Sequence, residues 1–228
     1  MEKAPDLTSA RLLLTNGRGG MAHVHAHLSA ITSKYDCLLA ANLHPEVPSD
    51  RHVFVKRVRA WVNANGFTSA LDNSYLSTCD PTEKVWVWNV PAGGDSRSIV
   101  KLQLQFQPHT NCLEATFERC AVDRNALPEL LADQAPVRLI LRFDLEDRNY
   151  HGETKWSDAV DQHFTTNTRM FGSRGFEFVP ATQRHLRVTS SGGQFHPAPE
   201  WSTGIPHPVE ASRGMEGKIG RASCRERV

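Results

Sequence analysis

The stretch Ser98–Gln107, SIVKLQLQFQ, decides the fold of this 228-residue chain. From Val100 onward, apolar and polar residues alternate along it: Val100, Leu102, Leu104 and Phe106 against Lys101, Gln103, Gln105 and Gln107. A side-chain period of two is that of a β-strand with one face buried and the other in solvent. The sequence therefore predicts a half-buried strand here.

The segments on both sides of this strand predict further strands. Residues 84–90 (KVWVWNV) and 112–120 (CLEATFERC) alternate in the same way, and short polar turns separate them from the central strand. Short connections favour neighbouring antiparallel strands. We therefore expect an antiparallel meander over 84–119, joined by a strand over 137–145 (VRLILRFDL), in a sheet of about four to six strands.

Other segments show the helical spacing of apolar residues. The clearest lies over 49–65, where Phe54, Val58, Trp61 and Val62 share one helix face; weaker patterns cover 21–31 and 157–168. Together with the meander they predict an α+β fold, with helices packed on one face of the antiparallel sheet. An all-β sandwich is the alternative, and it requires the helix over 49–65 to be absent.

The chain divides into three parts by composition. Residues 1–189 predict a single globular domain, and residues 190–218, rich in Gly, Pro and Ser, predict a flexible tail. The last ten residues, 219–228 (IGRASCRERV), are similar codon by codon to the translated end of a short-read sequencing adapter. We interpret them as not native and set them aside from the fold.

Charge and cysteine content narrow the class of protein. The formal net charge is +1, and it becomes −1 without the three arginines and one glutamate of the final decamer. A near-neutral chain does not support strong nucleic-acid binding. No CxxC pair, secretory signal or membrane-length apolar run is present, which predicts an intracellular, cytoplasmic protein without membrane contact. Partners are left open, self-association included.

His23, His25 and His27 (HVHAH) form the densest histidine group in the chain. On a strand all three rings would share one face and could bind zinc, whereas on a helix only His23 and His27 would do so. Surface histidines on an amphipathic helix are the alternative interpretation.

Two further patterns suggest phosphate chemistry. HLSA (27–30) and HFTT (163–166) resemble the paired His-x-Ser/Thr motifs of the two-histidine phosphoesterases, which would make His27 and His163 catalytic acid-base residues. Gly17, Gly19 and Gly20, in NGRGG, could present backbone N–H groups to a phosphate, although a tight turn that requires positive φ explains them equally.

Asp144, Glu146 and Asp147 lie at the end of the strand predicted over 137–145. Acidic groups there could bind a metal ion or act as a general acid, and they are also typical of a solvated turn.

Three functional hypotheses follow. The first is a non-enzymatic structural or interaction protein, of viral origin as a capsid or nucleic-acid-associated component. The second is a hydrolase or phosphoesterase that uses the His23–His27 cluster, with or without zinc. The third is a protein that binds a nucleotide or another phosphate ligand at the Asn16–Gly20 turn. The sequence leaves open whether the protein is an enzyme.

Overall fold

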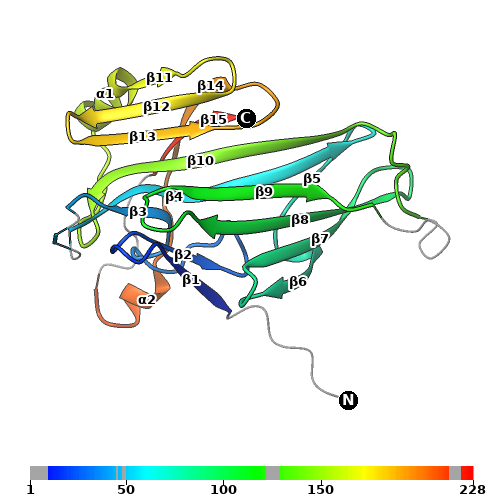
Figure 1. Cartoon of the computed structure of the whole chain (residues 1–228), viewed down its shortest axis with the longest axis horizontal. Helices are drawn as coiled ribbons and strands as arrows, with labels where there is room; N and C mark the ends of the chain where they lie inside the picture. Colours follow the sequence, from blue (N-terminus) through cyan, green and yellow to red (C-terminus); the bar gives the residue numbers. More distant parts are fainter. Residues whose placement is uncertain (1–9, 45, 48–49, 122–128, 216–221, 228) are drawn as a thin grey trace.

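The computed structural model describes residues 10–44, 46–47, 50–121, 129–215 and 222–227. Strands account for 52% of the structure and helices for 9%. The predicted α+β fold, with helices on one face of a sheet, is therefore wrong, and the all-β alternative fits. The strands form three antiparallel sheets, and Figure 1 shows the two labelled helices at the periphery, α1 (Asp158–Asn167) beside the small sheet at the top and α2 (Pro208–Ala211) at the bottom.

The largest sheet joins strands from both ends of the chain. Its path is β1 (Arg11–Thr15), β2 (Met21–His25), β3 (Cys37–Asn42), β4 (Arg51–Ala64), β10 (Val137–Asn149), β15 (Ala222–Arg227) and β14 (His196–Ser202), with β5 (Phe67–Ala70) paired to β4 beside this path. Strands β4 and β10 form its centre, with Val137 opposite Ala64 and Asn149 opposite His52.

The second sheet contains the meander that Ser98–Gln107 predicts. Its strands are β6 (Leu76–Asp80), β7 (Val85–Pro91), β8 (Arg97–Phe106) and β9 (Leu113–Arg119), in sequence order. The strand predicted over 137–145 does not join them, because it is part of β10 in the large sheet. The 3₁₀ helix η1 (Asn73–Tyr75) precedes β6.

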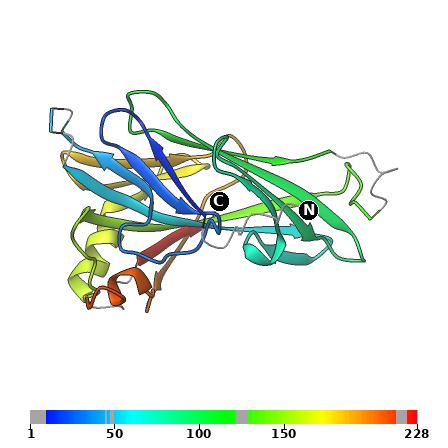
Figure 2. The same ribbon diagram turned by 90° about the horizontal axis from the view of Figure 1, so that it is seen from below.

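The third sheet is small and carries a helix. It consists of β11 (Thr168–Met170), β12 (Gly175–Ala181) and β13 (Arg184–Thr189), and α1 (Asp158–Asn167) packs on β12. Ser157 caps α1 by accepting a hydrogen bond from the Val160 N–H. A second helix, α2 (Pro208–Ala211), is a single turn. Figures 1 and 2 place α1 and the small sheet toward one end of the long axis.

The segment predicted as a helix over 49–65 is the strand β4. Val58, Ala60, Val62 and Ala64 are all buried, which is a period of two. The same segment also has apolar residues at helical spacing, so its periodicity is ambiguous. Its four valines favour a strand, because β-branched side chains fit a pleated surface, and β3 and β10 pair with it on either side.

The helix predicted over 21–31 is also absent. Residues 21–25 form β2, where Ala22 pairs with Leu14 and Val24 with Leu12 of β1. The chain then leaves the sheet through turns, and the indole of Trp86 donates a hydrogen bond to the Ala26 carbonyl oxygen at 2.9 Å. In that loop, Leu28 is buried in the main core and Ile31 is buried against Ile205.

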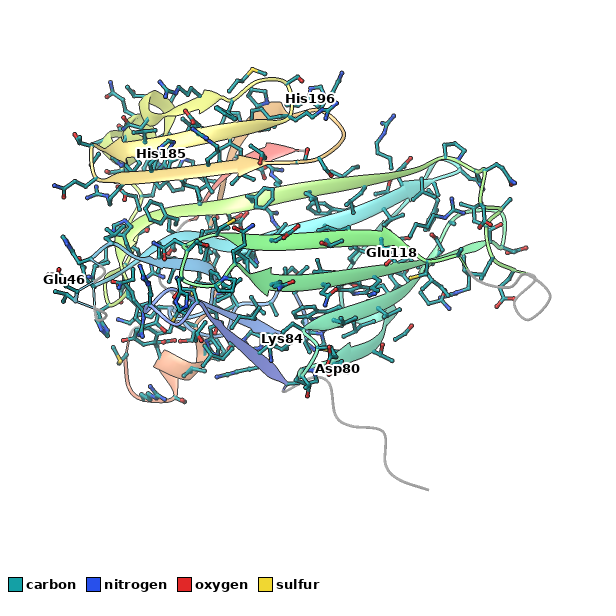
Figure 3. All side chains as sticks on the ribbon, viewed as in Figure 1. Glu46, Asp80, Lys84, Glu118, His185 and His196 are labelled. Carbon is teal, nitrogen blue, oxygen red and sulfur yellow. The ribbon has the colours of Figure 1, made fainter. Side chains whose placement is uncertain are left out.

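One continuous hydrophobic core connects the three sheets. It includes Trp86, Trp88 and Leu102 from the meander, Val62 and Leu145 from the large sheet, and Phe164, Phe176 and Phe178 from α1 and the small sheet. Polar side chains such as Glu118 on β9 and His185 on β13 are exposed on the outside of the sheets (Figure 3).

The segment predicted as a flexible tail contains β14 and α2. β14 pairs with β15, and β15 pairs with β10. Strand β15 lies within the decamer that we interpret as adapter-derived, and that interpretation stays a prediction. In the part of the chain that the structure describes, no helix is long and apolar enough to span a bilayer.

Candidate functional site

Two of the three clustered histidines bind one buried carboxylate. His23 and His25 alternate along β2 and share a face, so that Nδ1 of His23 lies 3.3 Å from Asp36 Oδ1 and Nε2 of His25 lies 3.1 Å from Asp36 Oδ2. The backbone N–H groups of Thr32 and Ser33 donate to the same carboxylate at 2.6 and 2.9 Å. Asp36 thus closes the loop that follows β2.

These contacts set the ionisation of Asp36. Burial by itself would raise the pKa of this carboxyl, but the hydrogen bonds from His23, His25 and the loop backbone outweigh it and hold the pKa well below its usual range. His27 lies beyond the end of β2, so the three rings do not form one set of ligands. Among the described residues, no group of three His, Cys, Asp or Glu side chains is placed to hold a metal ion.

In the NGRGG turn, the side chain of Asn16 accepts hydrogen bonds from backbone N–H groups of the turn itself. Asn16 Oδ1 accepts from the N–H groups of Arg18 and Gly20 at 2.8 and 2.9 Å. Gly17 and Gly19 have φ of +77° and +88°, and a Cβ on Gly20 would lie 2.4 Å from Asn16 Nδ2. Conformation and close packing therefore account for Gly17, Gly19 and Gly20. Two of the N–H groups that a phosphate would need are already bound.

The three predicted acidic residues lie within β10 and have separate partners. Asp144 is fully buried and accepts from Arg57 Nε at 2.6 Å. Glu146 forms an ion pair with Arg148. Asp147 lies beyond a register shift in the pairing of β10 with β4. Because each carboxylate binds its own cations, the three do not converge on one point.

Asp147 connects three separate elements. Its Oδ1 lies 2.5 Å from Nε2 of His52 on β4, and its Oδ2 lies 2.9 Å from Nε2 of His163 on α1. Arg184 of β13 adds a bidentate pair, with distances of 2.9 Å from Nε to Oδ1 and 3.1 Å from Nη2 to Oδ2. We call these four residues the Asp147 cluster. It fastens the small sheet and α1 to the large sheet.

The surroundings of Asp147 favour its ionised form. Burial acts to raise the pKa, but hydrogen bonds from His52, Arg184 and His163 lower it to about 2. His163 is thus a partner of Asp147 on α1, whereas His27 follows β2, and β3 and β4 lie between β2 and β10 in the large sheet. The pairing of His27 with His163 that the phosphoesterase motifs suggest has no support in this placement.

A second polar cluster is buried under α2 and the loop after β10. The Lys56 ammonium, 2% exposed, donates to the carbonyl oxygens of Ser33 and Lys34 at 3.0 and 2.8 Å. Arg148 donates to the carboxylate of Glu146 and to the Lys34 carbonyl oxygen, the latter at 2.6 Å. Burial lowers the pKa of Lys56. These residues line a pocket that we call the Lys56 pocket.

Sequence reasoning missed most of these contacts. Lys56, Arg57 and Arg59 form the basic run in FVKRVR, a pattern typical of a solvated face. In the structure Lys56 is in the interior, while Arg57 and Arg59 bind Asp144. A cationic residue in the middle of a valine-rich strand is the one signal that indicates a buried ion pair, and its partner cannot be known without the strand register.

The fold and these clusters define a class of protein: an all-β domain whose buried charges fasten its sheets together. The comparisons then give the family. The family described as "Glycogen debranching enzyme N terminal" matches residues 11–218, and the chain belongs to it. A search of curated proteins and a search of solved structures found no match.

This family membership corrects two interpretations made from the sequence. It supports neither a viral capsid or nucleic-acid-associated protein nor a phosphoesterase. The match begins at the first residue of β1 and ends at residue 218, so it includes strands β1 to β14 and the helices α1 and α2, but not β15 of the large sheet.

Proposed function

We propose that this chain is a non-catalytic, structural part of a glycogen debranching enzyme, corresponding to the amino-terminal portion that the family description names. The observation that carries the proposal is the family match, which extends over 11–218 and so includes β1 through α2. Its task is to fold as a β-rich unit and to pack against the part of the enzyme that performs the reaction.

The ionisation of the carboxyl groups supports a non-catalytic role. Glycoside hydrolysis ordinarily uses two carboxyl groups, one of which keeps its proton through a raised pKa and acts as the general acid. In this chain the resolved shifts of Asp36, Asp147 and Glu177 are all downward. Each is held ionised by histidine or arginine partners, which favours an anchoring role over proton donation.

The experiment compares this chain with the longer product of its source gene. Each is incubated with a branched glucan whose branches have been shortened, and the released glucose is measured. We expect no release by residues 1–218 above that of a heat-denatured sample. We expect release by the longer product and loss of that release when residues 11–218 are deleted. Glucose release by residues 1–218 alone would overturn the proposal.

A further inference from the structure

The Lys56 pocket is a small, partly open space next to the segment that leads into α2. Its cavity volume is about 10 Å³, and its lining includes Lys56, Glu146, Arg148, Thr154, Ile205 and His207. A cavity of roughly 10–15 Å³ by this measure holds one water molecule and nothing larger. The size of the pocket therefore limits its occupant to a single small guest.

Two side chains of this pocket have polar atoms without a protein partner. Thr154 is 8% exposed and His207 is 4% exposed. Within the described residues, no hydrogen bond is made by Oγ1 of Thr154 or by Nδ1 and Nε2 of His207. Leaving a buried hydroxyl or imidazole nitrogen without a hydrogen-bond partner destabilises the folded protein, because the group has given up its hydrogen bonds to water. A guest that both donates and accepts hydrogen bonds reduces this destabilisation, because it can pair with the Thr154 hydroxyl and with one of the two His207 nitrogens.

The charges around the pocket favour a neutral guest. Three cations, Lys34, Lys56 and Arg148, line it together with two carboxylates, Glu146 and Glu153. An anion would lie against the carboxylates and a cation against the ammonium and guanidinium groups. A water molecule can both accept and donate hydrogen bonds. It accepts from the Thr154 hydroxyl or from the third N–H of Lys56, since the other two donate to Ser33 and Lys34. It donates to His207 or Glu146.

We propose that the Lys56 pocket binds one structural water molecule, which bridges Thr154 and His207 and so attaches the segment 204–211 to the large sheet. The direct contacts of this segment include a hydrogen bond from Ser33 Oγ to Glu210 Oε1 at 2.6 Å. Through the water, the segment is also tied to the charged residues of β4 and β10.

The substitution Thr154→Val shows whether the pocket holds a water molecule, because the melting temperature changes in opposite directions with and without one. Valine has the shape of threonine without the hydroxyl. If a water molecule is bound, the variant takes away one of its partners, and we expect the melting temperature to fall by about 2–4 °C. If the pocket is dry, the variant removes an unpaired buried hydroxyl, and the melting temperature rises. A rise would overturn the proposal.

Thr116→Val is the matched control, since Thr116 is exposed on β9 and valine suits a strand. It should leave the melting temperature within about 1 °C of the parent. A crystal structure of the chain, with and without a bromide soak, identifies the guest. A single water peak within hydrogen-bond distance of Thr154 Oγ1 and a His207 nitrogen is expected. An anomalous bromide peak, or no peak at all, would overturn the proposal.

Discussion

At Asp147 a single carboxylate accepts hydrogen bonds from His52, His163 and Arg184, and the nearest of these in sequence is 16 residues away. The carboxylate is almost fully buried, while the side chains of His163 and Arg184 are about one-third exposed. Removing one partner from such a cluster leaves the others desolvated without compensation. The stabilising effect of Asp147 therefore depends on its charge.

We predict that Asp147→Asn lowers the free energy of unfolding by about 2 kcal/mol at pH 7, after allowance for the exposed partners. Because the pKa of Asp147 is lowered from 3.8 to about 2, its contribution is present above pH 4 and is lost as the pH falls toward 2. Urea unfolding at several pH values measures this. The difference in the free energy of unfolding between the parent and Asp147→Asn should shrink as the pH falls. The control Asp133→Asn, at an exposed position, should have the same free energy of unfolding as the parent at every pH.

His207 should make the protein sensitive to mild acid. Burial, together with the charge of Lys56, lowers the pKa of His207 from its ordinary 6.5. Its folded form resists protonation, so stability is complete above about pH 6.5 and falls as the pH decreases below that value. We predict a shallower loss of melting temperature between pH 7.5 and 5 for His207→Gln than for the parent. Equal slopes would contradict this, and His196→Gln, at an exposed position of β14, should behave as the parent.

The candidate site could be predicted from the sequence only in part. The histidines of HVHAH and the acids near 144–147 are in polar clusters, but their partners, such as Asp36 and Arg184, lie in unremarkable sequence. Those contacts depend on strand register and on a loop conformation. Neither is encoded in local spacing, because a shift of one residue moves every side chain of a strand to the other face.

Among the secondary-structure elements, β8 is one whose apolar periodicity is enough to predict both the strand and its buried face. Val100, Leu102, Leu104 and Phe106 are buried as the alternation predicts. The segment 51–64 shows the opposite case, because its apolar residues satisfy both a helical and a strand period. The pairing with β3 and β10 decides between them, and that information lies elsewhere in the chain.

We predict that Leu102→Ala in β8 destabilises the protein by about 2–5 kcal/mol, since Leu102 is fully buried between the two larger sheets. Gln105→Ala, on the solvent face of the same strand, should change the free energy of unfolding by no more than about 0.5 kcal/mol. Chemical denaturation of both variants measures this. Similar losses in the two variants would mean that the strand is covered on both faces.

For the whole molecule, the shared core predicts cooperative unfolding. Trp86 and Trp88 of the meander lie in the same hydrophobic cluster as Phe164 of α1 and Phe178 of the small sheet. We predict that tryptophan fluorescence and far-ultraviolet circular dichroism report one coincident urea transition. Two separated transitions would show that the small sheet and α1 unfold on their own, in conflict with the single domain expected from the sequence.

Sequencing the source gene tests whether residues 219–228 are native. We predict that genomic reads diverge from residues 219–228 just after Lys218, where the family match also ends. Reads that continue unchanged through Val228 would show the decamer to be native. In that case β15 would be a native strand between β10 and β14.

The pairing of β4 with β10 has a consequence for biosynthesis. Val137, which lies opposite Ala64, is translated about seventy residues later. At ~5–20 residues per second, roughly 4–15 seconds pass on the ribosome during which one edge of β4 has no neighbour. A valine-rich nascent strand is prone to aggregate in that interval, and charged residues within such a strand oppose aggregation. Strand β4 carries Lys56, Arg57 and Arg59, and Arg57 and Arg59 bind Asp144 once β10 is in place.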